Sequence, residues 1–547
     1  MKKFLFFPLV VILISGLILG GCAKSTTTPA STPTPTTTKA SPATTTTAAP
    51  ATTTAATTTA AAPKPQSGGI LKIIYSPGIT NMGVPGQPFT VGDMVFARCA
   101  VESLLDLDAK GNIIPWLATG WQYSADYKSL TLTLRKGVKF HDGTDFNAEA
   151  VKYCLDLAKP GRPDLSKITS VEVVDPYTVK LNIEVFEPRL LIVLCGLSGK
   201  IVSPTSLKTS IDAAKTHPVG TGPFEYESYQ RDVSLKFKKF AGYWQPGKPY
   251  LDGMEFVFIA DAVTRLVSFK AGEAQVLGTV VPKDASELVA TGKYGLNKTP
   301  SSVMGVAGDS AHTSSPFSDI KVRQAIAYAI DNEAIAKAMG YGIYQATNQF
   351  SAPGHYSYNP AVVGYPYNPQ KAKDLLAAAG YSKGLTTKLT CQAQNQAIYT
   401  AVLGYLKDVG IDATMDIADS GRWVQIQTGG WNNSLISYDI SHSYGLDKGD
   451  SLSSRVSSKS TQYPITSFWV PAVFEEKLNA ANAERDEKKR ATMIQEMMKM
   501  ITDEYCLAIP IYTGFGMAVY KSPEVHDMDM NVLANHIWHP ADAWLSK

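Results

Sequence analysis

Alternating apolar and polar residues predict that the first third of the chain is rich in β-strands. Residues 129–134 read SLTLTL, a period of two that is typical of a strand with one buried face. Two further alternating runs within 171–183 flank Asp175-Pro176, which predicts a hairpin turn. Strands are also expected over 69–75 and 233–240. The short apolar run 190–194 is interpreted as a buried strand at most.

From about residue 315 the pattern changes to helices alternating with strands. One helix face is marked by apolar residues at helical spacing, namely Val322, Ala325, Ile326, Ala329 and Ile330. Ser318 or Asp319 can cap this helix, and Asn368-Pro369 starts another that Gly380 ends. Strands over 385–393 and 411–417 then enclose a helix over 398–409. This order is typical of an α/β lobe with a parallel sheet.

The last hundred residues begin with a long, charged and amphipathic stretch. Residues 473–504 predict two helices with a break near Arg485-Asp486. A strand near 509–512 and an extended tail follow. A strand-rich part followed by an α/β part suggests that the tail returns to the first lobe.

The first 21 residues have the pattern of a secretory signal. Lys2 and Lys3 precede an apolar run over 4–19 that is too short for a confident membrane span. Two glycines then precede Cys22, an arrangement that resembles a bacterial lipobox, in which the cysteine is lipidated. We therefore expect a lipoprotein signal peptide over 1–21. The alternative is an ordinary cleaved signal with a chance cysteine.

Residues 22–67 are expected to form a lipidated spacer. This segment consists almost entirely of Thr, Ala, Pro and Ser, and it lacks the apolar residues needed for a core. Proline favours extended conformations, so such a segment separates a folded body from a membrane surface.

Composition limits the function of the remaining body. The chain has 547 residues, of which 44% are hydrophobic, and a net charge of +3 without a basic stripe that would indicate nucleic acid. The body is long enough for two or three lobes. Five cysteines lie beyond Cys22 without a C-x-x-C motif, so a zinc site is not expected. Most are interpreted as buried apolar residues, although one disulfide stays open.

Several ordered motifs resemble one known family. Residues 117–151 read LATGWQYSADYKSLTLTLRKGVKFHDGTDFNAEAV, which is similar to the signature of extracellular solute-binding proteins of family 5, the peptide/nickel group of ABC-transporter receptors. Tyr127 stands where the family usually has Gly, and Ala150 where it has Asp. Further similar stretches are PVGTGPFEYESY, SPFSDIKVRQAIAYAIDNEAI, YPYNPQKAKDLLAAAGY and ERDEKKRATMIQEMMKMITDEYCLAIPIY.

The resemblance implies an α/β fold of two lobes, the periplasmic-binding-protein fold of class II type with an extra subdomain in the first lobe. The implied ranges are 68–110, 215–305 and 513–547 for the first lobe, 111–214 for the subdomain, and 306–512 for the second lobe.

The resemblance also implies the function. The expected role is the substrate-binding component of an ABC importer, a monomer that captures a short peptide or similar solute in the cleft and delivers it to a permease and ATPase complex. The expected location is outside the cytoplasm, on the outer face of the cell membrane through a lipid anchor. Alternatives are a receptor for a nickel chelate, haem or oligosaccharide, a secreted enzyme, or a binding protein that serves a sensor. No cofactor is expected.

Neither catalysis nor metal binding is predicted from the candidate residues. His141-Asp142-Gly143-Thr144 has catalytic residue types, but Asp-Gly typically forms a tight turn. His536 and His539 lack nearby ligands and are followed by Pro540. No His-Glu-x-x-His or Gly-x-Ser-x-Gly motif is present.

The ligand-binding prediction rests on residues 438–454, YDISHSYGLDKGDSLSS. By resemblance, Tyr444 and Asp447 stand where peptide-binding members have the Trp and Asp of a Gly-Trp-x-x-Asp segment, and the Asp pairs with the ligand's ammonium group. A carboxylate in a closed cleft favours such a cation because an unpaired buried charge is costly. The alternative is that Asp447 is a solvated loop acid. Trp423 and Trp431 are candidates for cleft aromatics, with core packing as the alternative.

Overall fold

A computed structural model describes residues 64–108, 111–441, 448–460, 466–528, 530 and 538–546. The chain divides into two units, residues 1–62 and 63–547, and the fold described here is that of the second. The predicted signal peptide, the lipidation of Cys22 and nearly all of the spacer lie outside the described residues.

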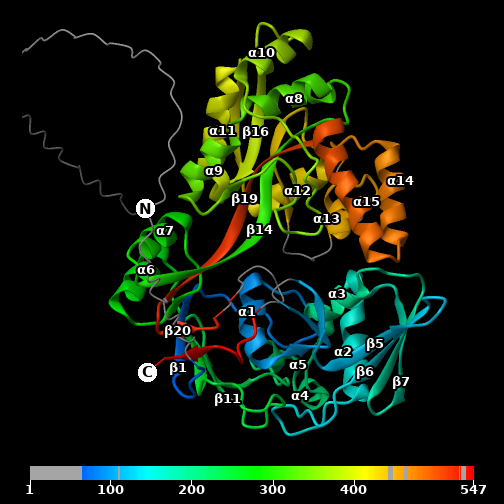
Figure 1. Ribbon diagram of the computed structural model, residues 1–547, viewed down its shortest axis with the longest axis vertical. Coiled ribbons are helices and arrows are strands. Elements are labelled where there is room, and N and C mark those ends of the chain that lie inside the picture. Colours follow the sequence, from blue (N-terminus) through cyan, green and yellow to red (C-terminus); the bar gives the residue numbers. More distant parts are fainter. Residues whose placement is uncertain are drawn as a thin grey trace, which may run out of the picture. The chain divides into compact units, whose positions relative to one another are not determined.

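A mixed sheet extends through the body (Figure 1). Among the described residues its order is β10-β11-β12-β1-β13-β19-β14-β18-β16-β17, with β15 also paired to β19. Its strands are β1 (Ile70–Tyr75), β10 (Phe224–Gln230), β11 (Ser234–Lys239), β12 (Gly253–Phe258), β13 (Val276–Leu277), β14 (Tyr294–Gly308), β15 (Gln345–Ala346), β16 (Leu385–Gln392), β17 (Ile411–Ala418), β18 (Leu435–Ser441) and β19 (Ala508–Lys521).

A separate antiparallel sheet and three strand pairs complete the β-structure of the described residues. The sheet has the order β5-β6-β8-β7, and the pairs are β2 with β9, β3 with β4, and β20 with β21. These strands are β2 (Glu102–Ser103), β3 (Leu105–Leu107), β4 (Ile113–Pro115), β5 (Ala118–Tyr123), β6 (Ser129–Leu134), β7 (Ile168–Asp175), β8 (Thr178–Ile183), β9 (Lys200–Ile201), β20 (Val525–His526) and β21 (Trp544–Leu545).

The helices fall into two groups, one in each half of the body. Those of the first half are α1 (Val91–Ala100), α2 (Ala148–Ala158), α3 (Leu190–Cys195), α4 (Pro204–Thr209), α5 (Ile211–Thr216), α6 (Ala262–Ala271) and α7 (Pro282–Ala290). Those of the second half are α8 (Ile320–Ala329), α9 (Asn332–Gly340), α10 (Pro369–Ala378), α11 (Gln396–Asp408), α12 (Ser420–Gly429), α13 (Lys448–Arg455), α14 (Ala472–Ala483) and α15 (Glu487–Lys499).

Two long strands connect the halves. β14 and β19 pair in antiparallel register from Tyr294↔Lys521 to Ala307↔Ala508, and Figure 1 shows them running together through the middle of the body. Ala518 of β19 packs in the core that contains α1 and the four-stranded sheet, whereas Ile509 packs in the core of α8, α10 and α11. The same strand pair is therefore part of both cores.

The helix starts and the parallel strands of the second half agree with their prediction. Asp319 caps α8 by accepting from the Lys321 amide, and Asn368 caps α10. β16 pairs in parallel with both β17 and β18, as the alternating pattern predicts. Arg323 of α8 is buried and donates to the carbonyl oxygens of Phe317, Ser318, Tyr505 and Cys506, so this helix is tied to the segment before β19.

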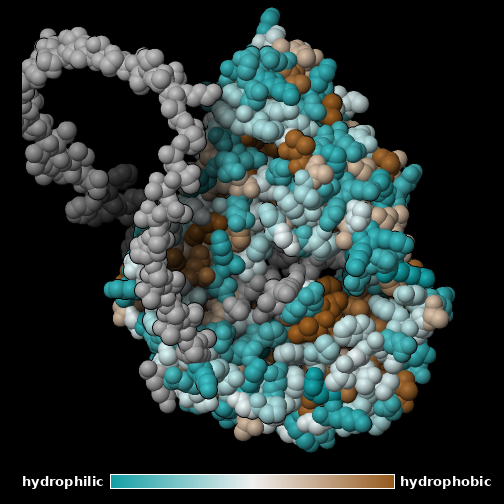
Figure 2. Space-filling model, viewed as in Figure 1, coloured by the Kyte–Doolittle hydropathy of each residue, from teal (hydrophilic) through white to brown (hydrophobic). Residues whose placement is uncertain are grey.

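The strand interpretation of 190–194 is wrong, because these residues form helix α3. Leu190 and Leu194 are buried one helical turn apart, while Leu191, Ile192 and Val193 are only partly buried. Figure 2 shows apolar surface where α3 lies in Figure 1. A continuous apolar run has no period of two or 3.6, so tertiary packing decides between strand and helix.

The five cysteines among the described residues are all free and buried, namely Cys99, Cys154, Cys195, Cys391 and Cys506. They pack as small apolar side chains, as the sequence favours for most of them. No disulfide links the described residues.

Candidate ligand-binding site

The strand order of the second half reverses direction at β16. The chain passes from β16 through α11 to β17, and then returns through α12 to β18 on the other side of β16. In parallel sheets such a reversal leaves an opening at the carboxyl ends of the strands, where ligands bind. Here those ends are Gln392, Ala418 and Ser441.

Charged and polar side chains gather at this edge. Asp416 near the end of β17 binds Arg422 of α12 with an Oδ2–Nη2 distance of 2.5 Å, and it accepts from the Thr390 hydroxyl at 3.1 Å. The hydrogen bond with Arg422 is the main cause that lowers the pKa of Asp416. The Asp419 side chain caps α12 by accepting from the backbone N–H of Arg422, which fixes the start of the helix that carries the Arg422 side chain.

A second set of polar contacts connects α12, α13 and β18. The Gln427 amide oxygen, oriented toward α13, accepts from Trp423 Nε1 at 3.2 Å and from Arg455 Nη1 at 3.1 Å. Arg455 Nη2 lies 3.9 Å from Asp439 Oδ2. Trp423, which is partly exposed, therefore belongs to the carboxyl edge.

Trp431 lies elsewhere. It precedes the amino end of β18, is 3% exposed, and packs against Tyr438 and Phe468 in a core cluster. Its backbone N–H donates to the Ser467 hydroxyl at 2.7 Å. Trp423 also packs against this cluster, but it stays partly exposed and bonds to Gln427, whereas Trp431 is buried within the cluster and has a packing role.

Tyr444 and Asp447 lie outside the described residues, in the segment between β18 and α13. Both flanking elements are described and bring Asp439 and Arg455 together. Sequence reasoning missed this pair and Gln427. The signal was present for Asp439, since alternation along β18 places it on the face opposite the buried Ile436, Tyr438 and Ile440.

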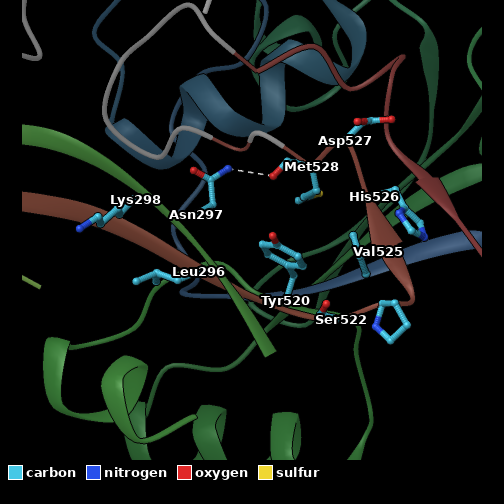
Figure 3. A pocket seen from close by; sticks show the side chains of 10 residues that line it. Leu296, Asn297, Lys298, Tyr520, Ser522, Val525, His526, Asp527 and Met528 are labelled. Atoms are coloured by element: carbon cyan, nitrogen blue, oxygen red, sulfur yellow. Dashed lines mark hydrogen bonds between the residues drawn. The ribbon is translucent and has the colours of Figure 1, made fainter. Parts of the chain in front are cut away.

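The first half of the sheet has a second reversal. β12 and β13 flank β1 and are parallel to it, although β1 comes first in the chain. Gly278 after β13 lies so close to Tyr75 that an added Cβ would be 2.4 Å from the ring. Nearby, Asn297, Tyr520 and Met528 line a cavity of about 520 Å³ (Figure 3). Asn297 Nδ2 donates to the Met528 carbonyl oxygen at 2.8 Å.

His141-Asp142-Gly143-Thr144 forms a scaffold turn. Asp142 accepts from the backbone N–H and hydroxyl of Thr144 and from the Ser203 hydroxyl. His141 contacts the Gly220-Thr221-Gly222 turn, with its backbone N–H donating to the Gly220 oxygen at 2.9 Å and its Nε2 3.0 Å from the Gly222 oxygen. Burial lowers the pKa of His141. The turn over 141–144 and the Gly220-Thr221-Gly222 turn therefore hold each other in place, which gives both motifs a structural role.

The described residues contain no group of three or more His, Cys, Asp or Glu side chains that could hold a metal ion. His539 lies 3.8 Å from Asp106 and stacks near Trp116, whereas His536 falls outside the described residues. No helix within the described ranges is long and apolar enough to span a membrane.

Comparison with known proteins identifies the family and the fold. Residues 112–450 match the family described as bacterial extracellular solute-binding proteins, family 5 Middle. Glutathione-binding protein GsiB of Shigella flexneri is 34% identical over 349 residues, which cover 61% of this chain and 68% of GsiB.

Two solved structures share the fold. DppA of Helicobacter pylori, in complex with the peptide STSA, superimposes with a TM-score of 0.71 at 22% identity, over 88% of this chain and 99% of DppA. NikA of Brucella suis, in complex with Fe(III)-EDTA, has a TM-score of 0.76 at 24% identity, over 87% of this chain and 100% of NikA. These neighbours are two-lobed binding proteins with a mixed α/β sheet, so the predicted fold class is confirmed. Because the family match spans most of the folded body and GsiB aligns over the same large share, the chain belongs to the bacterial extracellular solute-binding proteins of family 5.

Proposed function

We propose that this protein is the substrate-binding component of an ABC importer and that it captures a short peptide or a similar small solute between its two lobes. Members of its family are extracellular binding proteins rather than enzymes. The observation that carries the proposal is the set of charged side chains at the carboxyl ends of β16, β17 and β18, the expected position of a ligand crevice, where Asp439 and Arg455 flank the segment that contains Asp447. In this proposal the lobes have the ranges that the family resemblance implies, and the crevice belongs to 306–512.

The chemistry of this crevice suits a zwitterionic ligand. A carboxylate at Asp447 would pair with the ligand's ammonium group, and Tyr444 and Trp423 would line a side-chain pocket. Guanidinium groups bind carboxylates in a bidentate manner. Arg422 already binds both oxygens of Asp416 in this way, so Arg455 is the guanidinium here that suits a ligand carboxylate. Hydrogen bonds to the peptide backbone and wet side-chain pockets would tolerate different sequences. The relatives named for glutathione and for a peptide complex support this ligand class.

Transport follows from closure of the lobes. A ligand that contacts both lobes binds the closed form more tightly than the open form and so shifts the population toward closed. The closed protein then docks on the permease and ATPase complex. Lipidation at Cys22 would hold this monomer at the outer face of the cell membrane, with residues 22–67 as the spacer, because two or more acyl chains anchor stably.

Mass spectrometry of the purified unit from residue 63 onward tests the ligand class. Native spectra followed by denaturing spectra are expected to release short peptides. Asp447→Ala should lose them, whereas Asp408→Ala, an exposed acid at the end of α11, should retain them. Release of one non-peptide mass, such as a metal chelate or an oligosaccharide, would contradict the peptide assignment and the role of Asp447.

A further inference from the structure

Aromatic side chains of the four-stranded sheet face the corner between α14 and α15. The turn between β5 and β6 and the loop after β8 contribute Tyr127 and Phe186, and the helix corner contributes Asn482 and Arg485. These residues line a cavity of about 530 Å³. In the predicted domain ranges, the sheet belongs to the subdomain of the first lobe and the helices to the second lobe, so this contact joins the two lobes.

One cation contacts the ring cluster across this boundary. The Arg485 guanidinium carbon lies 4.3 Å from the Tyr127 ring centroid and 5.8 Å from that of Phe186. The Tyr127 and Phe186 rings meet edge to face at 5.0 Å, and Tyr123 lies 5.4 Å from Tyr127. A guanidinium over aromatic faces is attracted by their electrons and loses little hydration.

The backbone at Tyr127 indicates that its side chain has a role of its own. Its φ of 60° is in the left-handed region, which favours glycine. The turn itself is held by Asp126, which accepts from the Ser124 hydroxyl at 2.7 Å and from the Lys128 amide at 3.0 Å. Glycine would serve this turn at lower conformational cost. The tyrosine therefore keeps an unfavourable conformation at the position from which its ring reaches Arg485.

We propose that Arg485, Tyr127 and Phe186 form a clasp that holds the lobes closed and sets the fraction of closed protein in the absence of ligand. The clasp rests on the proposed function, because that function requires the lobes to open and close. Apparent affinity scales with the fraction of protein in the binding-competent state. A weaker clasp therefore lowers the affinity for every ligand by one common factor, without a change in the crevice.

Distances between two spin labels in the ligand-free full chain test the clasp. Labels at Glu172→Cys and Glu476→Cys occupy exposed sites on β7 and α14, Cys22→Ser removes the thiol at that position, and the other native thiols are buried. Wild type is expected to show a measurable population at the short distance beside the open form. Arg485→Ala should lower the ratio of closed to open protein about two- to fivefold, as loss of an exposed cation–π contact predicts.

Two further variants separate the clasp from general effects. Tyr127→Gly should lower the ratio as much as Arg485→Ala, although it removes the unfavourable backbone conformation. Lys488→Ala deletes an exposed positive charge at the start of α15, three positions from Arg485, and should leave the distances unchanged. Equal distributions in wild type, Arg485→Ala and Tyr127→Gly would overturn the clasp, as would a wild type that is entirely open.

The readout is independent of the ligand. If the distances change in Arg485→Ala and Tyr127→Gly but the protein releases no peptide, the clasp is supported and only the proposed function is contradicted. Unchanged distances in a protein that does bind peptides would overturn the clasp and leave the proposed function intact.

Discussion

Replacement of Glu102 by glutamine is expected to destabilise the first half of the protein. Glu102 is 3% exposed and accepts four hydrogen bonds. Its Oε1 accepts from Trp116 Nε1 and the Tyr243 hydroxyl, both at 2.9 Å. Its Oε2 accepts from the Thr221 hydroxyl at 2.8 Å and Trp244 Nε1 at 2.9 Å. Burial raises the pKa of Glu102 to about 7, and the four hydrogen bonds oppose this rise.

The magnitude follows from the donors at each oxygen. Glutamine places an NH₂ group at one of the two positions, and each position faces one indole N–H and one hydroxyl. A hydroxyl can rotate and accept, but an indole N–H is only a donor. One partly buried indole N–H therefore loses its acceptor at a cost of about 1–3 kcal/mol, and the remaining bonds weaken because their acceptor is no longer charged. Removal of the charge offsets part of this cost, because the buried carboxylate is itself disfavoured, as its raised pKa shows. We expect a net loss of about 1–2 kcal/mol in the free energy of unfolding.

Urea denaturation at pH 8, where the carboxylate is ionised, measures this change in the free energy of unfolding. Glu172→Gln is the matched control, since Glu172 is exposed and lies 3.6 Å from Lys180. Such a surface ion pair contributes less than about 1 kcal/mol. A Glu102→Gln protein as stable as that control would refute the reasoning that indole donors require a carboxylate here.

Two further changes test buried groups near α1. Lys200 Nζ is buried without a hydrogen-bond partner among the described residues, and burial lowers its pKa to about 7. The unfolded lysine titrates near 10.4. The penalty of the buried charge is therefore present in full below pH 7 and is relieved as the pH rises toward 10. The melting temperature of wild type should accordingly rise relative to that of Lys200→Met between pH 7 and 9.5. Parallel pH profiles of the two proteins would contradict this. Gly220→Ala should unfold at a much lower temperature, because the new Cβ would lie 2.1 Å from the Ala100 oxygen. Gly404→Ala on α11 meets no atom within 4 Å and should be neutral or stabilising by up to about 1 kcal/mol; similar melting of the two variants would show that the backbone at Gly220 can move.

Local chemistry was enough to predict many elements. The strand 129–134, the hairpin at Asp175-Pro176 and the caps Asp319 and Asn368 depend on residues close in sequence, and the structure has each of them. The break near Arg485-Asp486 also separates α14 from α15 as predicted. Alternation and capping act within a few residues, so the sequence alone determines them. The resemblance of the ordered motifs likewise identified the family before the fold was known.

Tertiary structure alone decided which distant residues meet. Trp423 and Trp431 are both aromatic and eight positions apart, yet Trp423 stays partly exposed and bonds to Gln427, whereas Trp431 is buried within the core cluster. The pairing of Asp439 with Arg455 depends on where α13 returns to the sheet. The four donors around Glu102 come from three segments over more than a hundred residues. Such contacts follow from strand order and chain reversal, which no local pattern contains, because a pairing between distant segments is stable only when the whole sheet forms.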